Sequence, residues 1–177
     1  MTTAKTNPQQ GRFRRIQNAV NARIRHPRAS AVSKGKGVDW DPRMLRGRHC
    51  VLVSYRRDGT PVPTPIWVAV EGDRVFVRTG ADAYKVKRIR RNPAVLLAPS
   101  TGRGRPTGPA MLGYARVLDQ DEEPVAERAL AARHGLLRRL YSKTVDSRLP
   151  TVYIEIGPAE PRSAPTPTAA PPSGSRR

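Results

Sequence analysis

Residues 74–93, RVFVRTGADAYKVKRIRRNP, decide how the chain folds, because their pattern changes in the middle. Residues 74–79 read as a β-strand, residues 80–82 as a turn, and residues 83–91 as a short helix. Asn92-Pro93 ends the helix, because the residue before a proline avoids the α region and proline has no N–H to donate. The sequence therefore predicts a strand, a turn and a helix in direct succession.

The same stretch carries a dense positive charge, with seven basic residues against one acid, Asp82. A strand that leads directly into a helix gathers backbone N–H groups and the positive end of the helix dipole at the turn, which favours a bound anion. We therefore interpret this corner as a phosphate pocket. Its basic residues are Arg74, Arg78, Lys85, Lys87, Arg88, Arg90 and Arg91.

Length and charge set the class of protein and of partner. The 177 residues suffice for one domain of ordinary size plus extensions, and the formal net charge is +19. Residues 39–156 alone hold 21 basic residues against 13 acids, so the presumed globular part is itself basic. The partner should therefore be anionic: a nucleic acid, a membrane surface or a multiply charged small molecule.

The positions of the cysteine, the histidines and the apolar residues exclude several other classes of protein. Cys50 is the only cysteine, which precludes an intrachain disulfide, and we expect it to be a buried strand residue. The three histidines lie apart, without carboxylates at ligand spacing, so we expect no metal site. The chain has no apolar run of about 18 residues and no apolar N-terminal signal, so we expect a cytoplasmic protein.

The first 38 residues form a basic N-terminal extension with nine Lys or Arg residues and no acid. Within it, residues 12–25 have the spacing of an amphipathic helix. Such a helix would lie on an anionic membrane or a nucleic acid, act as a transit peptide, or pack on its own domain. Residues 30–38 are typical of a linker. The apolar face of the helix consists of Phe13, Ile16, Val20 and Ile24.

A β-hairpin is predicted where the domain begins. Residues 49–55 form a strand pattern, and Asp58-Gly59 supplies the positive φ that a tight turn needs. The return strand carries Pro61, Pro63 and Pro65, which remove the N–H donors from one side of that strand. These prolines either protect an edge strand from aggregation or leave an open edge that forms one wall of a ligand groove.

The remaining patterns complete a mainly β fold with short helices (α+β). Strands are expected at residues 94–98, 110–118 and 151–156, and a helix at residues 124–134. With the hairpin and the strand at 74–79, this gives about six antiparallel strands, which favour closure into a small barrel. We assign residues 39–157 to this domain and residues 158–177 to a disordered tail rich in proline and alanine.

The glycine-rich loop at residues 101–108 is basic but has no P-loop or Rossmann spacing. Its Arg103-Gly104-Arg105-Pro106 resembles the core of an AT-hook, which binds the minor groove of DNA. Such hooks usually lie in disordered tails, whereas this one joins two strand patterns. We therefore favour a mobile loop over a bound ligand.

Catalysis by the protein's own nucleophile finds little support. No Ser, His and Asp arrangement and no carboxylate pair is recognisable, so a bound cofactor would perform the chemistry at this anion pocket. Tyr84, Tyr114, Tyr141 and Trp67 are aromatic residues that could line such a site. For Tyr114 and Trp67 we favour core packing.

Residues 54–106, SYRRDGTPVPTPIWVAVEGDRVFVRTGADAYKVKRIRRNPAVLLAPSTGRGRP, resemble the split β-barrel flavin and deazaflavin oxidoreductases related to pyridoxamine 5′-phosphate oxidase. The resemblance is strongest to the branch called PPOX-class F-420-dependent enzymes, which occurs in actinobacteria, and it covers about residues 44–156. Its most specific portion is the strand, turn and helix that end at Asn92-Pro93, with a lysine eight positions before the proline.

This resemblance implies a six-stranded split β-barrel like that of FMN-binding proteins. It also implies a homodimer with a coenzyme in the groove between the barrels. By position, Arg78, Thr79 and Lys85 match residues that hold the coenzyme phosphate. Lys87 and Arg88 are further candidates, and Pro63, Thr64 and Pro65 match the strand that runs past the ring.

The implied activity is hydride transfer from reduced coenzyme F-420 to an oxidised or unsaturated small molecule. Many relatives carry an arginine where this chain has Tyr84, a departure from FMN-using enzymes, and F-420 has a phosphodiester and an oligoglutamate tail that suit the positive excess. The loop at residues 103–107 would grip that tail or cover the ring. Tyr84 or water would supply the proton. The alternatives are an FMN-dependent enzyme of the same fold and a basic protein that binds nucleic acid or a membrane surface.

Overall fold

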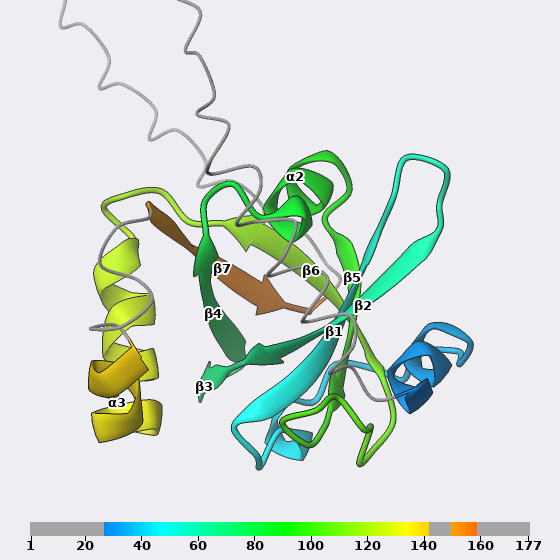
Figure 1. Ribbon diagram of the computed structural model, residues 1–177, viewed down its shortest axis with the longest axis horizontal. Helices are drawn as coiled ribbons and strands as arrows, with labels where there is room; N and C mark the ends of the chain where they lie inside the picture. The colour runs from blue at the N-terminus through cyan, green and yellow to red at the C-terminus, as the bar shows by residue number, and fades with distance from the viewer. Residues whose placement is uncertain (1–26, 142–149, 159–177) are drawn as a thin grey trace, which may run out of the picture.

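The computed structural model describes residues 27–141 and 150–158, and its centre is one antiparallel sheet of seven strands (Figure 1). The strands follow the order β2-β1-β5-β6-β7-β4-β3 across the sheet. Two 3-10 helices, η1 (Pro27–Ser33) and η2 (Pro42–Met44), precede β1. The other elements are β1 (His49–Tyr55), β2 (Pro61–Trp67), β3 (Ala69–Glu71), β4 (Arg74–Gly80), α2 (Tyr84–Arg91), β5 (Ala94–Pro99), β6 (Met111–Val117), α3 (Glu123–Tyr141) and β7 (Thr151–Gly157).

The sheet curls into a split barrel because its two edges are joined at one residue. The edge strands β2 and β3 are consecutive in the chain, and only Val68 stands between them. The edges must therefore meet at Val68, which is fully buried. Its N–H donates to the Arg48 carbonyl at 3.1 Å, and its carbonyl lies 2.9 Å from His134 Nε2.

The predicted mainly β fold with short helices is confirmed, whereas the expected number of six strands is wrong by one. The run of residues 61–70 was interpreted as a single strand, but it bends at Val68 and supplies β2 and β3. No turn residue marks this bend, because residues 66–70, IWVAV, are apolar on both sides of it.

Apolar residues are buried on both faces of the central strands. Val75, Val77 and Leu52 lie in the core enclosed by the curled sheet. Outside it, η1 covers Val51 and Val53 of β1, and α3 covers Phe76 of β4. This arrangement explains why several strands read as continuous apolar runs rather than as alternating patterns.

The hairpin and its proline edge are confirmed. β1 and β2 pair in antiparallel register, with Pro61, Pro63 and Pro65 opposite Tyr55, Val53 and Val51. The turn between them places Gly59 at φ 79°. β2 lies at the edge of the sheet, as expected for a strand with three missing N–H donors.

The chain before β1 packs on the barrel, so the expectation of a linker at residues 30–38 is wrong. Ala29 and Val32 of η1 are buried against the outer face of β1 and β5. Val38 exchanges hydrogen bonds with its neighbours on β6, with its N–H donating to Ala110 at 2.8 Å and its carbonyl accepting from Leu112 at 2.9 Å. The predicted helix at residues 12–25 and the predicted disordered tail after residue 158 lie outside the described residues.

The predicted helix at residues 124–134 is confirmed as the first part of α3. It begins at Glu123 and continues to Tyr141 past a kink at Gly135, where φ is 47°. Within the described residues, no helix is long and apolar enough to cross a membrane.

Candidate functional site

The strand, turn and helix of residues 74–93 form as predicted and close one end of the barrel. β4 runs into α2 through a turn in which the Ala83 N–H donates to the Gly80 carbonyl at 3.1 Å. Val86 and Ile89 of α2 are buried against the core. Ala83 caps the helix without a side-chain hydrogen bond, so no side chain of the cap occupies the start of α2.

The turn brings together two of the three residues expected to hold a phosphate, Thr79 and Lys85, whereas Arg78 points to the opposite face of β4, which it shares with Phe76. Lys85 Nζ donates to Thr79 Oγ1 at 2.9 Å. Arg78 Nε and Nη2 donate to Thr151 Oγ1 at 3.3 and 3.2 Å. Arg78, Thr79 and Lys85 are each half-buried, so their polar atoms are held in place and still reach solvent.

Arg88 extends this cluster toward β1. Its Nε donates to Ser54 Oγ at 2.9 Å, and Ser54 is fully buried at the end of β1. Thr64 of β2 lies opposite Leu52, on the same face of the sheet as Ser54. Lys85 and Arg88 are three residues apart on the helix, so they share one side of α2. The cationic corner therefore consists of Thr79, Lys85, Arg88 and Ser54, whereas Arg78 and its partner Thr151 lie on the other face of the sheet.

The other predicted site residues lie elsewhere. Lys87 is exposed, and its Nζ lies 5.9 Å from the centre of the Tyr84 ring, which is also exposed at the start of α2. Pro63 and Pro65 point to the opposite face of β2 from Thr64. A Cβ at Gly104 would lie 2.6 Å from Pro65 Cγ, so Pro65 contacts the loop after β5 rather than α2.

The loop at residues 101–107 is a folded turn and not a mobile arm. The Thr101 N–H donates to the Arg105 carbonyl at 2.9 Å, and the Gly104 N–H donates to the Thr101 carbonyl at 2.8 Å. Gly104 is buried at φ 81°. The loop adjoins His49, at the opposite end of β1 from α2. The expectation of mobility is therefore wrong, and the extended form that an AT-hook requires is absent from the Arg103–Pro106 turn.

Two polar partners of the basic residues, Ser54 and Thr151, were not predicted. Thr151 stands 73 residues after Arg78, and only the pairing of β4 with β7 brings the two together. The role of Ser54 as a partner of Arg88 depends on how α2 packs on β1.

Two of the remaining aromatic and cysteine predictions are confirmed and one is wrong. Trp67 is half-buried and stacks on His134 with 5.2 Å between ring centres. Burial raises the pKa of the Cys50 thiol to about 12, as expected for an inert core residue. Tyr114 is 41% exposed, because Met111, Gly113 and Ala115 take the inward positions of β6. The side chain of Tyr141 lies outside the described part.

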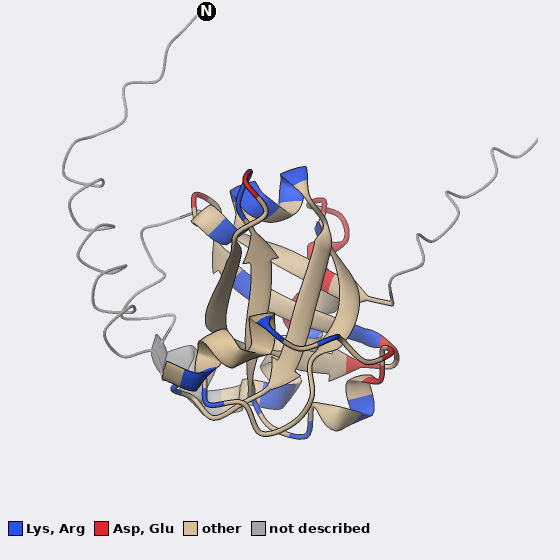
Figure 2. Cartoon of the chain, turned by 90° about the vertical axis from the view of Figure 1, so that its right-hand side faces the viewer, with Lys and Arg blue, Asp and Glu red and all other residues tan. Residues whose placement is uncertain are grey.

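The donor set of the corner fits the acidic end of a coenzyme. A guanidinium, an ammonium and hydroxyl groups are the donors that bind phosphate oxygens, and they meet beside a helix start that has no side-chain cap. Figure 2 shows basic residues concentrated on α2 and on loops at the other end of the barrel. Among the described residues, no group of three or more His, Cys, Asp or Glu side chains could hold a metal ion.

The fold is a split β-barrel, and the sequence identifies its family. Residues 44–162 match the sequence family described as pyridoxamine 5′-phosphate oxidase, which is more than half of the chain. The protein belongs to that family. A comparison with curated proteins finds no match.

Solved structures share the fold at low sequence identity. The heme storage protein HutZ from Vibrio cholerae is 13% identical, with a TM-score of 0.50 over 70% of this chain and 93% of that one. A FAD-binding protein from Mesorhizobium loti is 15% identical, with a TM-score of 0.49 over 66% and 85% of the two chains. An F420 reductase is 22% identical, with a TM-score of 0.46 over 67% and 93%.

Proposed function

We propose that the protein is an oxidoreductase that holds reduced coenzyme F-420 by its acidic end at the cationic corner. The observation that carries this proposal is the cluster of Thr79, Lys85 and Arg88 beside the start of α2, where no side chain caps the helix. Membership of the pyridoxamine 5′-phosphate oxidase family supports a flavin-type coenzyme. The cluster supports an anionic group as the point of attachment.

The charge of the segment favours F-420 over FMN. Residues 74–93 hold seven basic residues against one acid, and two of the seven, Lys85 and Arg88, belong to the corner. F-420 carries a phosphodiester followed by carboxylates, so it offers an anionic group to each of these two cations. An FMN-dependent enzyme of the same fold is the alternative.

The residues of this chain would anchor and orient the coenzyme. When bound, the reduced deazaflavin supplies a hydride to an oxidised or unsaturated small molecule. Lys85 and Arg88 would fix the acidic end, while Thr64 and Ser54 lie where the inner face of β1 and β2 reaches α2. Tyr84, which is 53% exposed beside this corner, is our candidate for the proton source, with water as the alternative.

We further propose that two copies of the chain form the complete enzyme. Leu112 and Tyr114 on the outer face of β6 are 46% and 41% exposed, and Val38 beside them is 40% exposed. Contiguous exposed apolar side chains are typical of a surface that another protein covers. A second copy placed there would supply the other wall of a coenzyme groove.

The test is a titration of F-420 fluorescence with the protein. We expect saturable quenching at one coenzyme per chain that persists at moderate salt, because several ordered hydrogen bonds contribute to binding. Quenching that falls steeply with salt, without saturation, would indicate non-specific attraction of a polyanion to a basic protein. Tight binding of FMN without binding of F-420 would establish the alternative coenzyme.

Tyr84 is tested separately by Tyr84→Phe in an assay with any substrate that F-420 reduces. A proton donor predicts slower turnover with unchanged F-420 affinity and a shifted pH profile. If turnover and its pH profile are unchanged, water is the proton source.

A further inference from the structure

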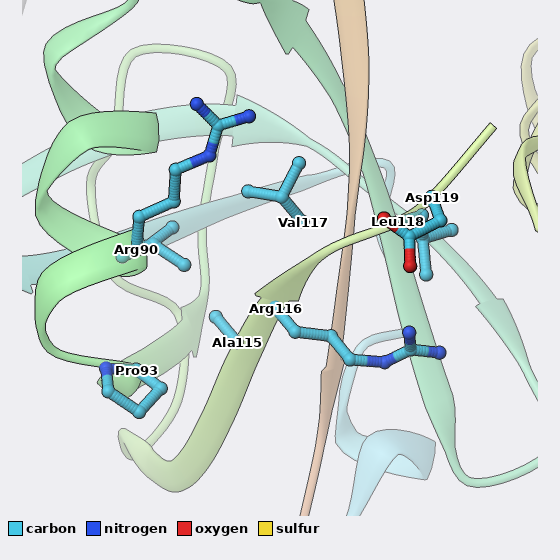
Figure 3. Close-up of a pocket in the computed structure, with 8 residues that line it drawn as sticks. Arg90, Pro93, Ala115, Arg116, Val117, Leu118 and Asp119 are labelled. Atoms are coloured by element: carbon cyan, nitrogen blue, oxygen red, sulfur yellow. The ribbon is translucent and has the colours of Figure 1, made fainter.

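A cavity lies beside the C-terminal half of α2, and none of the residues of the cationic corner lines it. It opens between the C-terminal half of α2 and the end of β6 and has a volume of about 320 Å³ (Figure 3). This volume is at the lower end of the range of about 300–1,000 Å³ in which small-molecule pockets fall. The cavity borders Ile89 and Arg90, whereas the corner uses Lys85 and Arg88.

The floor of this cavity is apolar. Ile89, Ala115 and Leu118 line it, and each is at most 5% exposed. Pro93 extends the apolar surface at the end of α2, beside β6, where the Ala115 N–H donates to the Pro93 carbonyl at 2.8 Å. An aliphatic group placed here would therefore leave water for a hydrocarbon surface.

Two opposite charges stand at the rim of the cavity. Arg90 comes from α2 and Asp119 follows β6, and both are exposed (Figure 3). Within the described residues, neither side chain makes a hydrogen bond or an ion pair. Each is therefore available to a ligand.

The third charged residue at the cavity is already paired. Arg116 Nη1 donates to Glu122 Oε2 at 2.6 Å, and its Nη2 donates to Glu155 Oε2 at 3.2 Å. Its positive charge is therefore matched by two carboxylates. A ligand in the cavity would meet one free cation, Arg90, and one free anion, Asp119.

We propose that this cavity binds a small zwitterion with an aliphatic body, such as an apolar amino acid. The carboxylate would face Arg90, the ammonium group would face Asp119, and the hydrocarbon would lie on Ile89 and Leu118. Opposite charges at the rim exclude dianions and dications, because each would place like charges together. This binding does not depend on the proposed coenzyme, since no corner residue takes part.

The probe for this proposal is L-leucine, followed by amide NMR of the full chain without coenzyme. We expect saturable shifts at Ile89, Arg90, Leu118 and Asp119. The same titration with 4-methylpentanoate, which lacks the amino group, and with 3-methylbutylamine, which lacks the carboxylate, should give affinities about two- to fivefold lower, as exposed ion pairs contribute modestly. Absence of saturable shifts at these four amides would overturn the proposal.

Charge reversal provides the stricter test. Arg90→Glu and Asp119→Arg should each weaken leucine binding by about tenfold, because each replaces one attraction with a repulsion. The double variant should restore binding, since a zwitterion fits either order of charges. Arg105→Glu, at an exposed arginine on a distant loop, is the matched control and should change nothing. A double variant that binds no better than the single variants, or an equal effect of Arg105→Glu, would contradict the proposal.

Discussion

The barrel carries two basic helices, α2 and α3. The cations of the two helices donate hydrogen bonds to different kinds of acceptor. At the α3 end, Arg133 Nη2 donates to the main-chain carbonyls of Leu45, Arg46 and Gly47 at 3.1, 2.7 and 2.9 Å. At the α2 end, Lys85 and Arg88 donate to side-chain hydroxyl groups at 2.9 Å. Positive charge alone therefore does not identify the functional end of this molecule.

The group that accepts the hydrogen bond distinguishes a cation that stabilises the fold from a cation that can bind a ligand. Arg133 joins three main-chain carbonyls before β1, of which that of the buried Leu45 most needs a protein donor, so Arg133 contributes to stability. The hydroxyl group of Thr79, at a half-buried position, can itself donate to a phosphate oxygen. The difference assigns stability to the α3 end and coenzyme binding to the α2 end.

The largest expected effect is on F-420 binding in the double variant Lys85→Ala, Arg88→Ala. Because each hydrogen bond to a charged group contributes about 1.5–3 kcal/mol, we expect the affinity to fall by at least about 100-fold. Fluorescence quenching measures it, and Arg128→Ala, at an exposed arginine of α3, is the control that should leave affinity unchanged. If the double variant binds F-420 within threefold of the unsubstituted protein, Lys85 and Arg88 do not hold the coenzyme, and coenzyme binding cannot be assigned to the α2 end.

Arg133→Ala should show the reverse behaviour. Removal of one guanidinium leaves three carbonyls without their donor, and we expect the free energy of unfolding to fall by about 2–3 kcal/mol. Urea denaturation measures this loss, and F-420 affinity should stay constant when measured well below the unfolding midpoint. If the free energy of unfolding is unchanged and F-420 affinity falls, Arg133 contributes to coenzyme binding rather than to stability, which would contradict this assignment.

Gly104→Ala compared with Gly59→Ala tests whether the loop at residues 101–107 belongs to the α3 end. Both glycines have a φ near 80°, so either substitution costs about 1–2 kcal/mol of backbone strain. Only at Gly104 would the new Cβ meet Pro65, at 2.6 Å. We expect Gly104→Ala to be less stable than Gly59→Ala by about 1 kcal/mol in thermal unfolding.

The same pair of variants tests the earlier idea that this loop grips the coenzyme tail. The loop adjoins His49, far along β1 from Ser54, so F-420 affinity should be equal in the two variants. A selective loss of affinity in Gly104→Ala would assign the loop to the coenzyme site.

The smallest expected effect is a pH dependence at the α3 end. Burial lowers the pKa of His134, and the nearby cations Arg48 and Arg133 lower it further. In the unfolded chain the same group titrates near pH 6.5, so the unfolded state binds more protons below that pH. Stability is therefore complete above about pH 6.5 and falls as the pH approaches the lowered folded pKa, by less than about 1.4 kcal/mol per pH unit.

His134→Gln, which keeps an N–H for the Val68 carbonyl, should reduce this slope in unfolding measurements between pH 5.5 and 7.5. Burial also lowers the pKa of His49, so part of the slope should remain. An identical slope in the variant would show that His134 does not titrate with folding.

Local sequence signals predicted the elements of this fold well. The strand, turn and helix at residues 74–93, the Asp58-Gly59 hairpin and the start of α3 each depend on residues within one short window. The contact of Lys85 with Thr79 depends on the same short window, whereas Arg78, next to Thr79 in the sequence, points to the other face of β4. Periodicity, turn residues and proline positions are sufficient for such features.

Features that depend on distant pairing were missed. The division of residues 61–70 at Val68 follows from closure of the sheet, and the contact of Arg78 with Thr151 follows from pairing of β4 with β7. Pro63, Thr64 and Pro65 were predicted to match the strand that runs past the coenzyme ring, and alternation along β2 places Thr64 on the opposite face from the two prolines. The loop at residues 101–107 was expected to be mobile because of its glycines, yet Gly104 packs against Pro65.

The most direct test compares F-420 with its deazaflavin chromophore lacking the acidic tail, on the protein and on Lys85→Ala, Arg88→Ala. If the cationic corner holds the acidic end, F-420 should bind the protein at least about 100-fold more tightly than the chromophore does, and the variant should bind both with equal affinity. Equal affinity of the protein for the two compounds, or an unchanged preference in the variant, would contradict the account.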